Sequence, residues 1–295
     1  GMKFSSRARR APRKSLIVFE RAEKEEGVQG NDGEWEEIQA VASLSSRVLE
    51  AFILALICVL AISIRMFVIV RYEPVLTEFD SYFNLHASRI LVNEGFTSFL
   101  NHFDTHSWYP YGRPIGTTIQ PLLMIACGGV MYISRVLCFP ISLRSVSIAL
   151  PTLLSCISCI CAYVLAREVK GPGAGLLAAA LIAISPGYLS RSTPGNFDNE
   201  SLALPLTLLT LFFWTLSLKS KTTPPPLLTG LSQSLTLAAW GGGIFLPNLI
   251  SLHTLLLLIK ASGISFRVLY VAYSTYYITS IAMVTAMPWG GELGG

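Results

Sequence analysis

The sequence GAGLLAAALIAISPGYLSRSTPGNFDNESLALPLTLLTLFFWTLSL, residues 173 to 218, decides the fold. It contains two apolar runs, 173–189 and 201–218, which enclose a polar turn from Ser190 to Glu200. Runs rich in leucine and alanine satisfy their backbone hydrogen bonds in lipid only as helices. We therefore expect two membrane helices joined by a charged turn at the membrane surface.

Similar apolar runs recur along the chain, most of them near the length of about 20 residues that a membrane helix needs. They lie near residues 48–70, 117–138, 145–166, 227–246, 247–259 and 268–288. The 295-residue chain is 52% hydrophobic and only 14% charged, whereas soluble domains carry about 25% charged residues. The predicted fold class is an all-α polytopic membrane protein.

Basic residues in the short connectors predict how the helices are oriented. They form three clusters: Arg167 with Lys170, Lys219 with Lys221, and Lys260 with Arg267. All three fit one cytosolic face, which places the turn from Ser190 to Glu200 on the lumenal face. The net charge of +4 is scattered over tails and connectors, which is typical of topological signals, so we expect no nucleic-acid partner.

These patterns divide the chain into five regions. We expect a disordered cytosolic tail at 1–46, a first transmembrane helix at 47–71, a large first lumenal loop at 72–144, a transmembrane helix bundle at 145–288, and a short lumenal end at 289–295. If Asp80 is to lie on the same face as Asp198, an even number of crossings must separate them. We therefore expect the run 117–138, which Pro121 and Gly128 interrupt, to form an interfacial or partly inserted helix.

The charged turn and the first loop hold the candidate site residues. Asp198 and Glu200 can point to one side of an extended turn and offer the oxygen ligands that Mg²⁺ or Mn²⁺ prefers. They also suit the first turn of a helix starting at Ser201, where the helix dipole favours acids. Arg191 offers a fork for phosphate oxygens or, alternatively, extends from the membrane edge into water. Asp80 is either a ligand or a solvated acid among interfacial aromatic residues.

Five segments, in order, resemble the catalytic subunit of oligosaccharyltransferase. They are EFDSYFN (78–84), WYPYGR (108–113), GAGLLAAALIAISPGYLSRS (173–192), FDNE (197–200) and WGGGIFLPNLISLH (240–253). The resemblance implies a GT-C type glycosyltransferase in the endoplasmic reticulum membrane, multi-pass, with its site facing the lumen. It implies transfer of an oligosaccharide from a lipid-linked dolichyl diphosphate to asparagine in Asn-x-Ser/Thr sequons, in protein N-glycosylation.

The resemblance also implies roles for particular residues. Asp80 matches the family's first-loop aspartate, a catalytic metal ligand that contacts the acceptor amide. Asp198 and Glu200 match its other metal ligands, for Mn²⁺ or Mg²⁺, and Arg191 matches an arginine important for activity. The partners implied are the lipid-linked oligosaccharide, the acceptor polypeptide and other subunits of the enzyme.

The chain also departs from the family's pattern. Ser81 and Pro194 stand where the family usually has other residues, which affects local loop geometry. Family members continue with further helices and a soluble lumenal domain bearing a WWDYG motif, which these residues lack. We therefore expect an incomplete, amino-terminal part of such an enzyme, inactive alone. The alternatives are a secondary transporter that binds a substrate at Arg191, Asp198 and Glu200, or a non-catalytic membrane scaffold.

Overall fold

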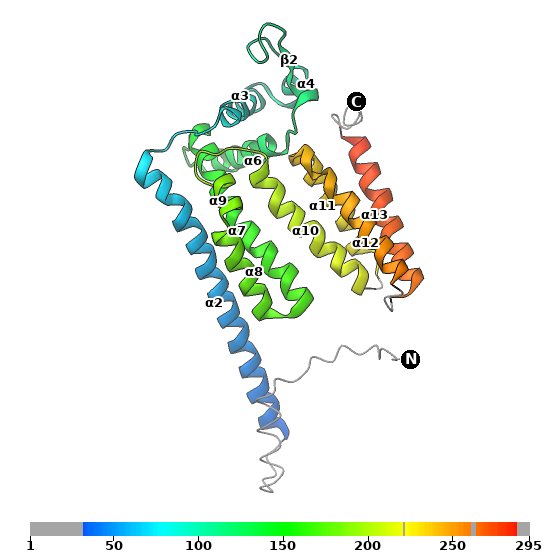
Figure 1. Ribbon diagram of the computed structural model, residues 1–295. Helices are drawn as coiled ribbons and strands as arrows, with labels where there is room; N and C mark the ends of the chain where they lie inside the picture. The colour runs from blue at the N-terminus through cyan, green and yellow to red at the C-terminus, as the bar shows by residue number, and fades with distance from the viewer. Residues whose placement is uncertain (1–31, 221, 261–263, 288–295) are drawn as a thin grey trace. The chain divides into compact units, whose positions relative to one another are not determined.

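The computed structural model describes residues 32–220, 222–260 and 264–287, and helices dominate it (Figure 1). The helices are α2 (Asp32–Tyr72), α3 (Phe79–Glu94), α4 (Phe96–Asn101), α5 (Ile115–Thr118), α6 (Leu122–Val136), α7 (Leu143–Lys170), α8 (Pro172–Ile184), α9 (Pro186–Arg191), α10 (Glu200–Lys219), α11 (Pro224–Ala239), the 3-10 helix η1 (Gly241–Ile244), α12 (Phe245–Ile259) and α13 (Phe266–Ala286). Two short strands, β1 (Phe103–Asp104) and β2 (Arg113–Pro114), pair antiparallel.

The chain divides into two compact units, Gly1–Phe52 and Ile53–Gly295. In the first unit α2 begins at Asp32, so residues 32–46, which the sequence predicted as disordered tail, are helical. The reason is that no proline and no glycine after Gly33 interrupts this segment, so the helix of the following apolar run extends back through it. The predictions for residues 1–31 and 289–295 fall outside the described residues.

Among the described residues, five helical segments are long and apolar enough to cross a membrane: Gln39–Tyr72, Leu143–Lys170, Glu200–Lys219, Gly241–Ile259 and Phe266–Ala286. The predicted run 173–189 is not one helix, because Pro186 divides it into the shorter helices α8 and α9, and the run that starts near 227 forms the 16-residue helix α11. The boundary predicted at residue 246 was wrong. The chain instead breaks at Trp240, which has an extended backbone, and three glycines then lead through η1 into α12.

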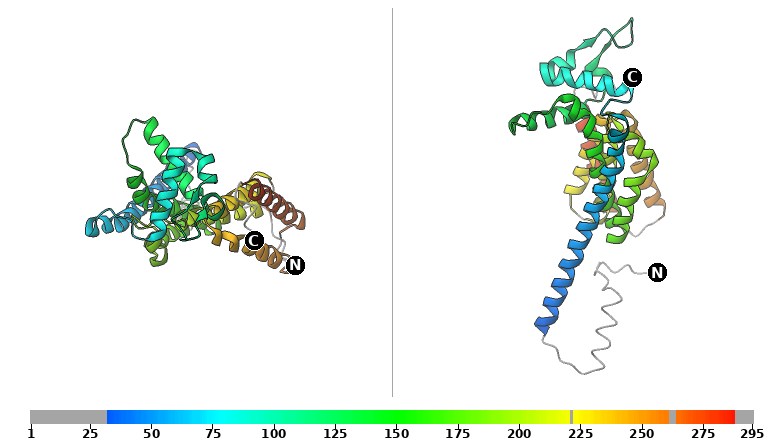
Figure 2. Two further views of the ribbon diagram at one scale, coloured as in Figure 1. Left: turned by 90° about the horizontal axis from the view of Figure 1, so that it is seen from above. Right: turned by 90° about the vertical axis from the view of Figure 1, so that its left-hand side faces the viewer.

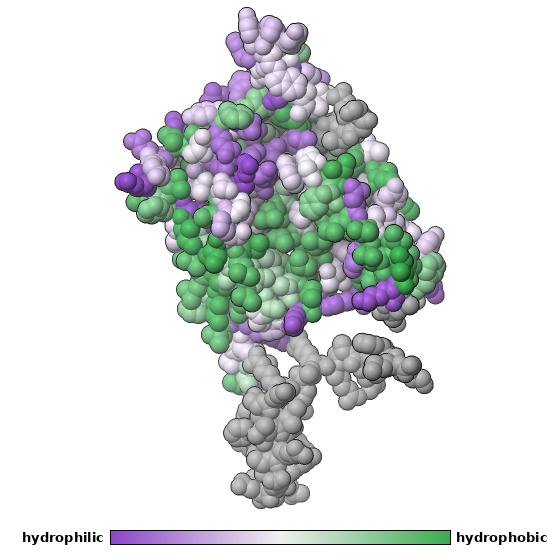
Figure 3. Space-filling model, viewed as in Figure 1, coloured by the Kyte–Doolittle hydropathy of each residue, from purple (hydrophilic) through white to green (hydrophobic). Residues whose placement is uncertain are grey.

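In the larger unit the long helices stand side by side (Figure 1). Helix α7 packs against α8 and α10, and α11 packs against α10 and α13. From Ile53 onward, α2 joins this row through Ala61, which packs in one cluster with Cys159 of α7 and Ala179 of α8. Hydrophobic residues cover the visible flank of the row and hydrophilic ones gather toward its ends (Figure 3). This distribution is what a protein surrounded by lipid requires.

The first loop folds over one end of the row. Helices α3 and α6 lie at that end in both side views (Figures 1 and 2), and α3 packs on α6 and α7. Helix α6 has 15 residues and is shorter than the five candidate spans. The run 117–138 was expected to form an interfacial or partly inserted helix, so that an even number of crossings separates Asp80 from Asp198. The short length of α6 is compatible with that expectation, and the position of α6 relative to lipid stays a prediction.

The basic connectors lie at the opposite end of the row. Lys219 Nζ is 3.0 Å from Glu168 Oε1, which joins the carboxyl ends of α10 and α7. Arg267, at the start of α13, lines a cavity of about 450 Å³ with Ser217 and Ser220 from the end of α10. The basic clusters in the described residues therefore share one end, as the sequence predicted, while the membrane face to which that end belongs stays a prediction.

One hydrophobic core joins the loop to the bundle and fixes the turn between α9 and α10. It includes Leu85 of α3, Leu123 of α6, Leu150 of α7 and Phe197 of the turn. Phe197 is completely buried. The polar turn is thus anchored by one aromatic side chain, and its charged residues are left at the edge of the core.

Candidate active site

Gly195 positions the turn that follows α9. Its N–H donates to the carbonyl of Ile148 in α7 at 3.1 Å, and its carbonyl accepts from the N–H of Thr77 at 3.2 Å. Its φ is +88°, and a Cβ at this position would lie 2.0 Å from the carbonyl oxygen of Val75. Only glycine allows this approach. The turn is therefore held between α7 and the connector that leads into α3.

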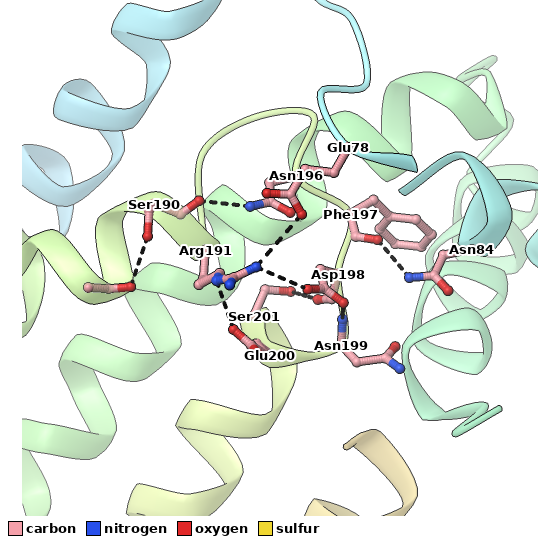
Figure 4. Close-up of polar contacts among 11 residues, drawn as sticks. Glu78, Asn84, Ser190, Arg191, Asn196, Phe197, Asp198, Asn199, Glu200 and Ser201 are labelled. Carbon is pink, nitrogen blue, oxygen red and sulfur yellow. Dashed lines mark hydrogen bonds and ion pairs between the residues drawn. The ribbon is translucent and has the colours of Figure 1, made fainter. Parts of the chain in front are cut away.

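Side-chain amides complete the attachment of the turn to the first loop (Figure 4). Asn84 Nδ2 of α3 donates to the carbonyl of Phe197 at 2.9 Å. Asn196 Nδ2 donates to the carbonyl of Ser190 at 2.7 Å and closes the turn on itself. These contacts bring together the two acidic segments, around residues 78–80 and 198–200, that are far apart in the sequence.

A single guanidinium lies among three carboxylates at this junction (Figure 4). Arg191 Nε is 3.0 Å from Glu200 Oε2, and Arg191 Nη1 is 3.7 Å from both Asp198 Oδ2 and Glu78 Oε2. The side chain of Asp198 is 17% exposed and that of Arg191 44% exposed, so the cluster is open to solvent on one side. Three carboxylates facing one cation leave an excess of negative charge.

Asp80 forms no ion pair with Arg191. Asp80 is an exposed residue in the first turn of α3, and none of the ion pairs of the described residues includes it. Glu78, two residues earlier, is the loop acid that approaches Arg191. The sequence analysis assigned no role to Glu78, although it belongs to the same EFDSYFN segment as Asp80. No signal in the sequence distinguishes Glu78 from Asp80, because its approach to Arg191 depends on contacts across the fold.

The alternative interpretations from the sequence are partly realised. Glu200 lies in the first turn of α10, where its charge suits the helix dipole. Asn199 is the N-cap residue of α10 but its side chain makes no capping hydrogen bond. Arg191 pairs with acids from two segments in place of extending freely into water. Asp198 and Glu200 can therefore stabilise the start of α10 and also take part in binding a ligand.

The carboxylates around Arg191 are groups of the kind that bind divalent cations. Carboxylate oxygens are the ligands that Mg²⁺ and Mn²⁺ accept, and the excess negative charge favours a cation. In the described part of the chain, no group of three or more His, Cys, Asp or Glu side chains is arranged to hold a metal ion. The carboxylates are turned toward Arg191. The residues therefore match such a cation in kind and charge, while their side chains are arranged around Arg191.

The WYPYGR segment forms the far part of the first loop. The guanidinium carbon of Arg113 lies 3.8 Å from the ring centre of Phe83 and 4.9 Å from that of Trp108. Buried Asp104 accepts hydrogen bonds from Ser107 Oγ at 2.6 Å and from the N–H of His106 at 2.9 Å. Burial raises the pKa of Asp104, but these hydrogen bonds outweigh it and hold the pKa below its ordinary value.

The fold is a bundle of helices, with five candidate membrane spans among the described residues, a loop over one end and a charged turn beneath that loop. The family model described as "Oligosaccharyl transferase STT3, N-terminal" matches residues 48–291. The chain belongs to this family. The match confirms the resemblance carried by the five sequence segments, and it is to a transferase family, which removes the support for a transporter.

Curated relatives agree with the family. The Schizosaccharomyces pombe dolichyl-diphosphooligosaccharide–protein glycosyltransferase subunit stt3 is 41% identical over 243 residues, covering 82% of this chain and 32% of the relative. The corresponding Saccharomyces cerevisiae subunit is 37% identical, covering 86% of this chain and 35% of the relative. This chain therefore spans about a third of the length of these relatives.

Solved structures confirm the fold class. The crystal structure of the Archaeoglobus fulgidus oligosaccharyltransferase in the apo form matches with a TM-score of 0.70 at 19% identity, covering 82% of this chain and 30% of that chain. The same archaeal enzyme, AglB, in complex with an inhibitory peptide and a dolichol-phosphate, matches with a TM-score of 0.68 at 18% identity, covering 81% and 29%. At these identities the likeness shows the fold alone.

Proposed function

We propose that this chain forms the donor-binding part of a glycosyltransferase. That enzyme moves an oligosaccharide from a lipid-linked dolichyl diphosphate to asparagine in Asn-x-Ser/Thr sequons. The observation that carries the proposal is the meeting of Arg191 with Glu78, Asp198 and Glu200 beneath the first loop. The family and the names of its relatives supply the reaction class.

Arg191 is assigned to the diphosphate of the donor. A guanidinium presents planar, paired donors that match phosphate oxygens, and its charge is permanent. Its side chain is partly exposed, so a ligand can reach it. When the diphosphate binds, it competes with the carboxylates for Arg191. The carboxylates are then released from the guanidinium and are free to rotate.

Asp80, Asp198 and Glu200 are assigned to a divalent cation, Mn²⁺ or Mg²⁺. Such a cation, when bound, offsets the negative charge that develops on a departing diphosphate. Glu78 adds a fourth carboxylate within reach of Arg191. An archaeal relative was solved with zinc and sulfate, which supports a site for a divalent ion and an anion in this fold.

Asp80 is also assigned to the acceptor. The nitrogen of an asparagine amide is a weak nucleophile because its lone pair is delocalised into the carbonyl. A carboxylate that accepts hydrogen bonds from its N–H groups favours rotation about the C–N bond and makes the nitrogen more reactive. The exposure of Asp80 leaves it accessible to a polypeptide.

The same proposal places the chain in the endoplasmic reticulum membrane, with the site on the lumenal side and further subunits as partners. Its relatives are named as subunits of the dolichyl-linked enzyme. Because the chain spans about a third of their length, we expect these 295 residues to be inactive alone. Robust glycopeptide formation by the isolated chain with Mn²⁺ would refute that expectation.

The test of the site is a chimera in which residues 48–291 replace the matching region of the S. pombe relative. We expect it to form glycopeptide from a lipid-linked oligosaccharide. Asp80→Ala and Asp198→Ala should each lower turnover by about a hundredfold or more, the usual cost of removing one group that stabilises developing charge. The control is Glu94→Ala, which removes an exposed acid at the far end of α3.

Normal turnover by either aspartate variant would refute the site assignment. The cation is tested separately on the chain itself by Mn²⁺ titration followed by electron paramagnetic resonance. Asp198→Asn keeps the size of the side chain and removes its charge, so Mn²⁺ affinity should fall. An unchanged affinity would exclude Asp198 as a ligand.

A further inference from the structure

Arg65 is a buried cation about two turns before the end of α2. It lies in the part of α2 that belongs to the larger unit, within the candidate span Gln39–Tyr72, and its exposed fraction is 0%. No ion pair of Arg65 occurs among the described residues. A charge buried in this way is costly, and intramembrane charges usually have a specific task.

The break between α8 and α9 explains what Arg65 binds. Pro186 has no N–H group, so α8 cannot continue through it and its last carbonyls lack helical donors. Arg65 Nη1 donates to one of these, the carbonyl of Ala183, at 3.0 Å. The positive charge is also favourable at the carboxyl end of a helix. Arg65 therefore caps α8 from a neighbouring helix.

The same guanidinium holds the other side of the break. Arg65 Nε donates to Ser192 Oγ at 2.8 Å, and its guanidinium carbon lies 5.4 Å from the ring centre of Tyr188 in α9. Ser192 Oγ in turn donates to the carbonyl of Tyr188 at 2.5 Å, and Thr152 Oγ1 of α7 donates to the carbonyl of Ser192 at 3.3 Å. Ser192 is thus fixed from three helices.

Ser192 directly follows Arg191, whose guanidinium faces the three carboxylates. We propose that Arg65 is a positioning residue, which fixes the α8–α9 break and Ser192 so that Arg191 faces Glu78, Asp198 and Glu200. A positioning role differs from a general contribution to stability, because it predicts that loss of the guanidinium loosens the break and the turn more than the rest of the bundle. The inference rests on the proposed function only for the role of Arg191.

The test is amide hydrogen exchange of the whole 295-residue chain in detergent, read by mass spectrometry. Arg65→Met removes the guanidinium and keeps a similar side-chain volume. Ser192→Ala removes one of the oxygens that accept hydrogen bonds from the guanidinium. Loss of hydrogen bonds to a charged group should speed exchange of the amides of residues 192–198 by roughly tenfold or more. Exchange in α13 should stay unchanged. The double variant should be no faster than Arg65→Met alone, because both remove one linkage.

Two outcomes would overturn the inference. One is unchanged exchange of the turn in both single variants, and the other is faster exchange throughout the bundle, which would mean that Arg65 only stabilises the fold. If Arg65→Met does not fold, Ser192→Ala carries the test, since it keeps the guanidinium in place. Arg65→Lys keeps the positive charge but lacks the planar guanidinium that donates to both Ala183 and Ser192. In Arg65→Lys we expect the amides of residues 192–198 to exchange as fast as in Arg65→Met. Exchange at the wild-type rate would contradict the need for a guanidinium.

A second measurement separates this inference from the proposed function. In the chimera, Arg65→Met should raise the KM for the lipid-linked donor several-fold, as a displaced Arg191 would. A loosened turn with an unchanged KM would leave Arg65 as the residue that positions Arg191 and would refute diphosphate binding by Arg191. An unchanged turn would refute the positioning role itself.

Discussion

Gly195 is the residue at which the turn beneath the first loop tolerates no side chain. Its left-handed backbone, with φ +88°, alone makes Gly195→Ala costly, by roughly 1–3 kcal/mol. The methyl group would also collide with the carbonyl of Val75 and push the turn away from the connector. We expect a lower thermal midpoint in detergent and faster proteolysis of the first loop.

Gly129→Ala is the matched control. A Cβ on Gly129 would have no heavy atom within 4 Å, and this glycine lies inside α6. Alanine in a helix interior is favoured over glycine by roughly 0.5–1 kcal/mol. The control should therefore be neutral or slightly stabilising. Equal effects of the two variants would show that space at residue 195 is not the constraint.

The residues of the candidate site differ in how far the sequence predicts them. Arg191, Asp198 and Glu200 lie within one short polar stretch, so their proximity follows from the chain itself. Glu78 joins them through contacts across the fold, by way of Gly195 and Phe197. No spacing rule links residues so distant in sequence. For the same reason, sequence alone could not tell which acid of the segment 78–80 approaches Arg191, and Asp80 is exposed in the structure.

At the scale of elements, Asp104 orders the loop between β1 and β2. Its carboxylate accepts from Ser107 Oγ and from the N–H of His106, while it is buried. Asp104→Asn removes the charged acceptor, and we expect a loss of roughly 1–3 kcal/mol at pH 7. The melting temperature in detergent should fall accordingly. Ser98→Ala, in α4, is a control that breaks a solvent-exposed hydrogen bond to Glu94.

The pH dependence follows from the lowered pKa of Asp104. A carboxyl group whose folded pKa lies below the unfolded value of about 3.9 stabilises the fold above that pH. The contribution is lost as the pH falls through the folded pKa. The difference in melting temperature between wild type and Asp104→Asn should therefore shrink from pH 7 to pH 3. A constant difference would mean that the carboxylate charge contributes nothing.

Gly230 sets the distance between α11 and α13. A Cβ there would lie 2.7 Å from Thr279 Cβ and 2.8 Å from the carbonyl of Tyr276. Gly230→Ala should force the helices apart and cost roughly 1–3 kcal/mol, weakening the hydrogen bond from Ser234 Oγ to the carbonyl of Ser280. Faster amide hydrogen exchange in α13 would show that the two helices have moved apart. Gly173→Ala, with no atom near its Cβ, should leave α13 unchanged.

At the scale of the whole molecule, the sequence predicted the helical class and the order of the membrane segments well, because apolar length determines both. It placed the break after α11 several residues late, since periodicity cannot locate a boundary inside a long apolar run. Trp240 and the following glycines determine that boundary. It also did not predict the task of Arg65, because its partners, Ala183 and Ser192, are brought to α2 only by tertiary packing.

The arrangement of charges over the bundle predicts how the chain lies in its membrane. Arg191 and its carboxylates occupy the end under the first loop, and Lys219 and Arg267 occupy the other end. Basic residues stay on the cytosolic side during insertion. The two ends should therefore react with reagents from opposite sides of the membrane, and the candidate site should face the lumen.

Single cysteines test this prediction in sealed microsomes. Ser190→Cys reports on the end under the first loop and Thr222→Cys on the basic end, and both positions are exposed. The naturally exposed Cys138 is first replaced by serine. A maleimide that cannot cross membranes should label residue 222 directly and residue 190 only after detergent is added. Labelling of residue 190 in intact vesicles would place the site in the cytosol, where dolichyl-linked transfer to lumenal polypeptides is impossible, and the proposed function would fail with it.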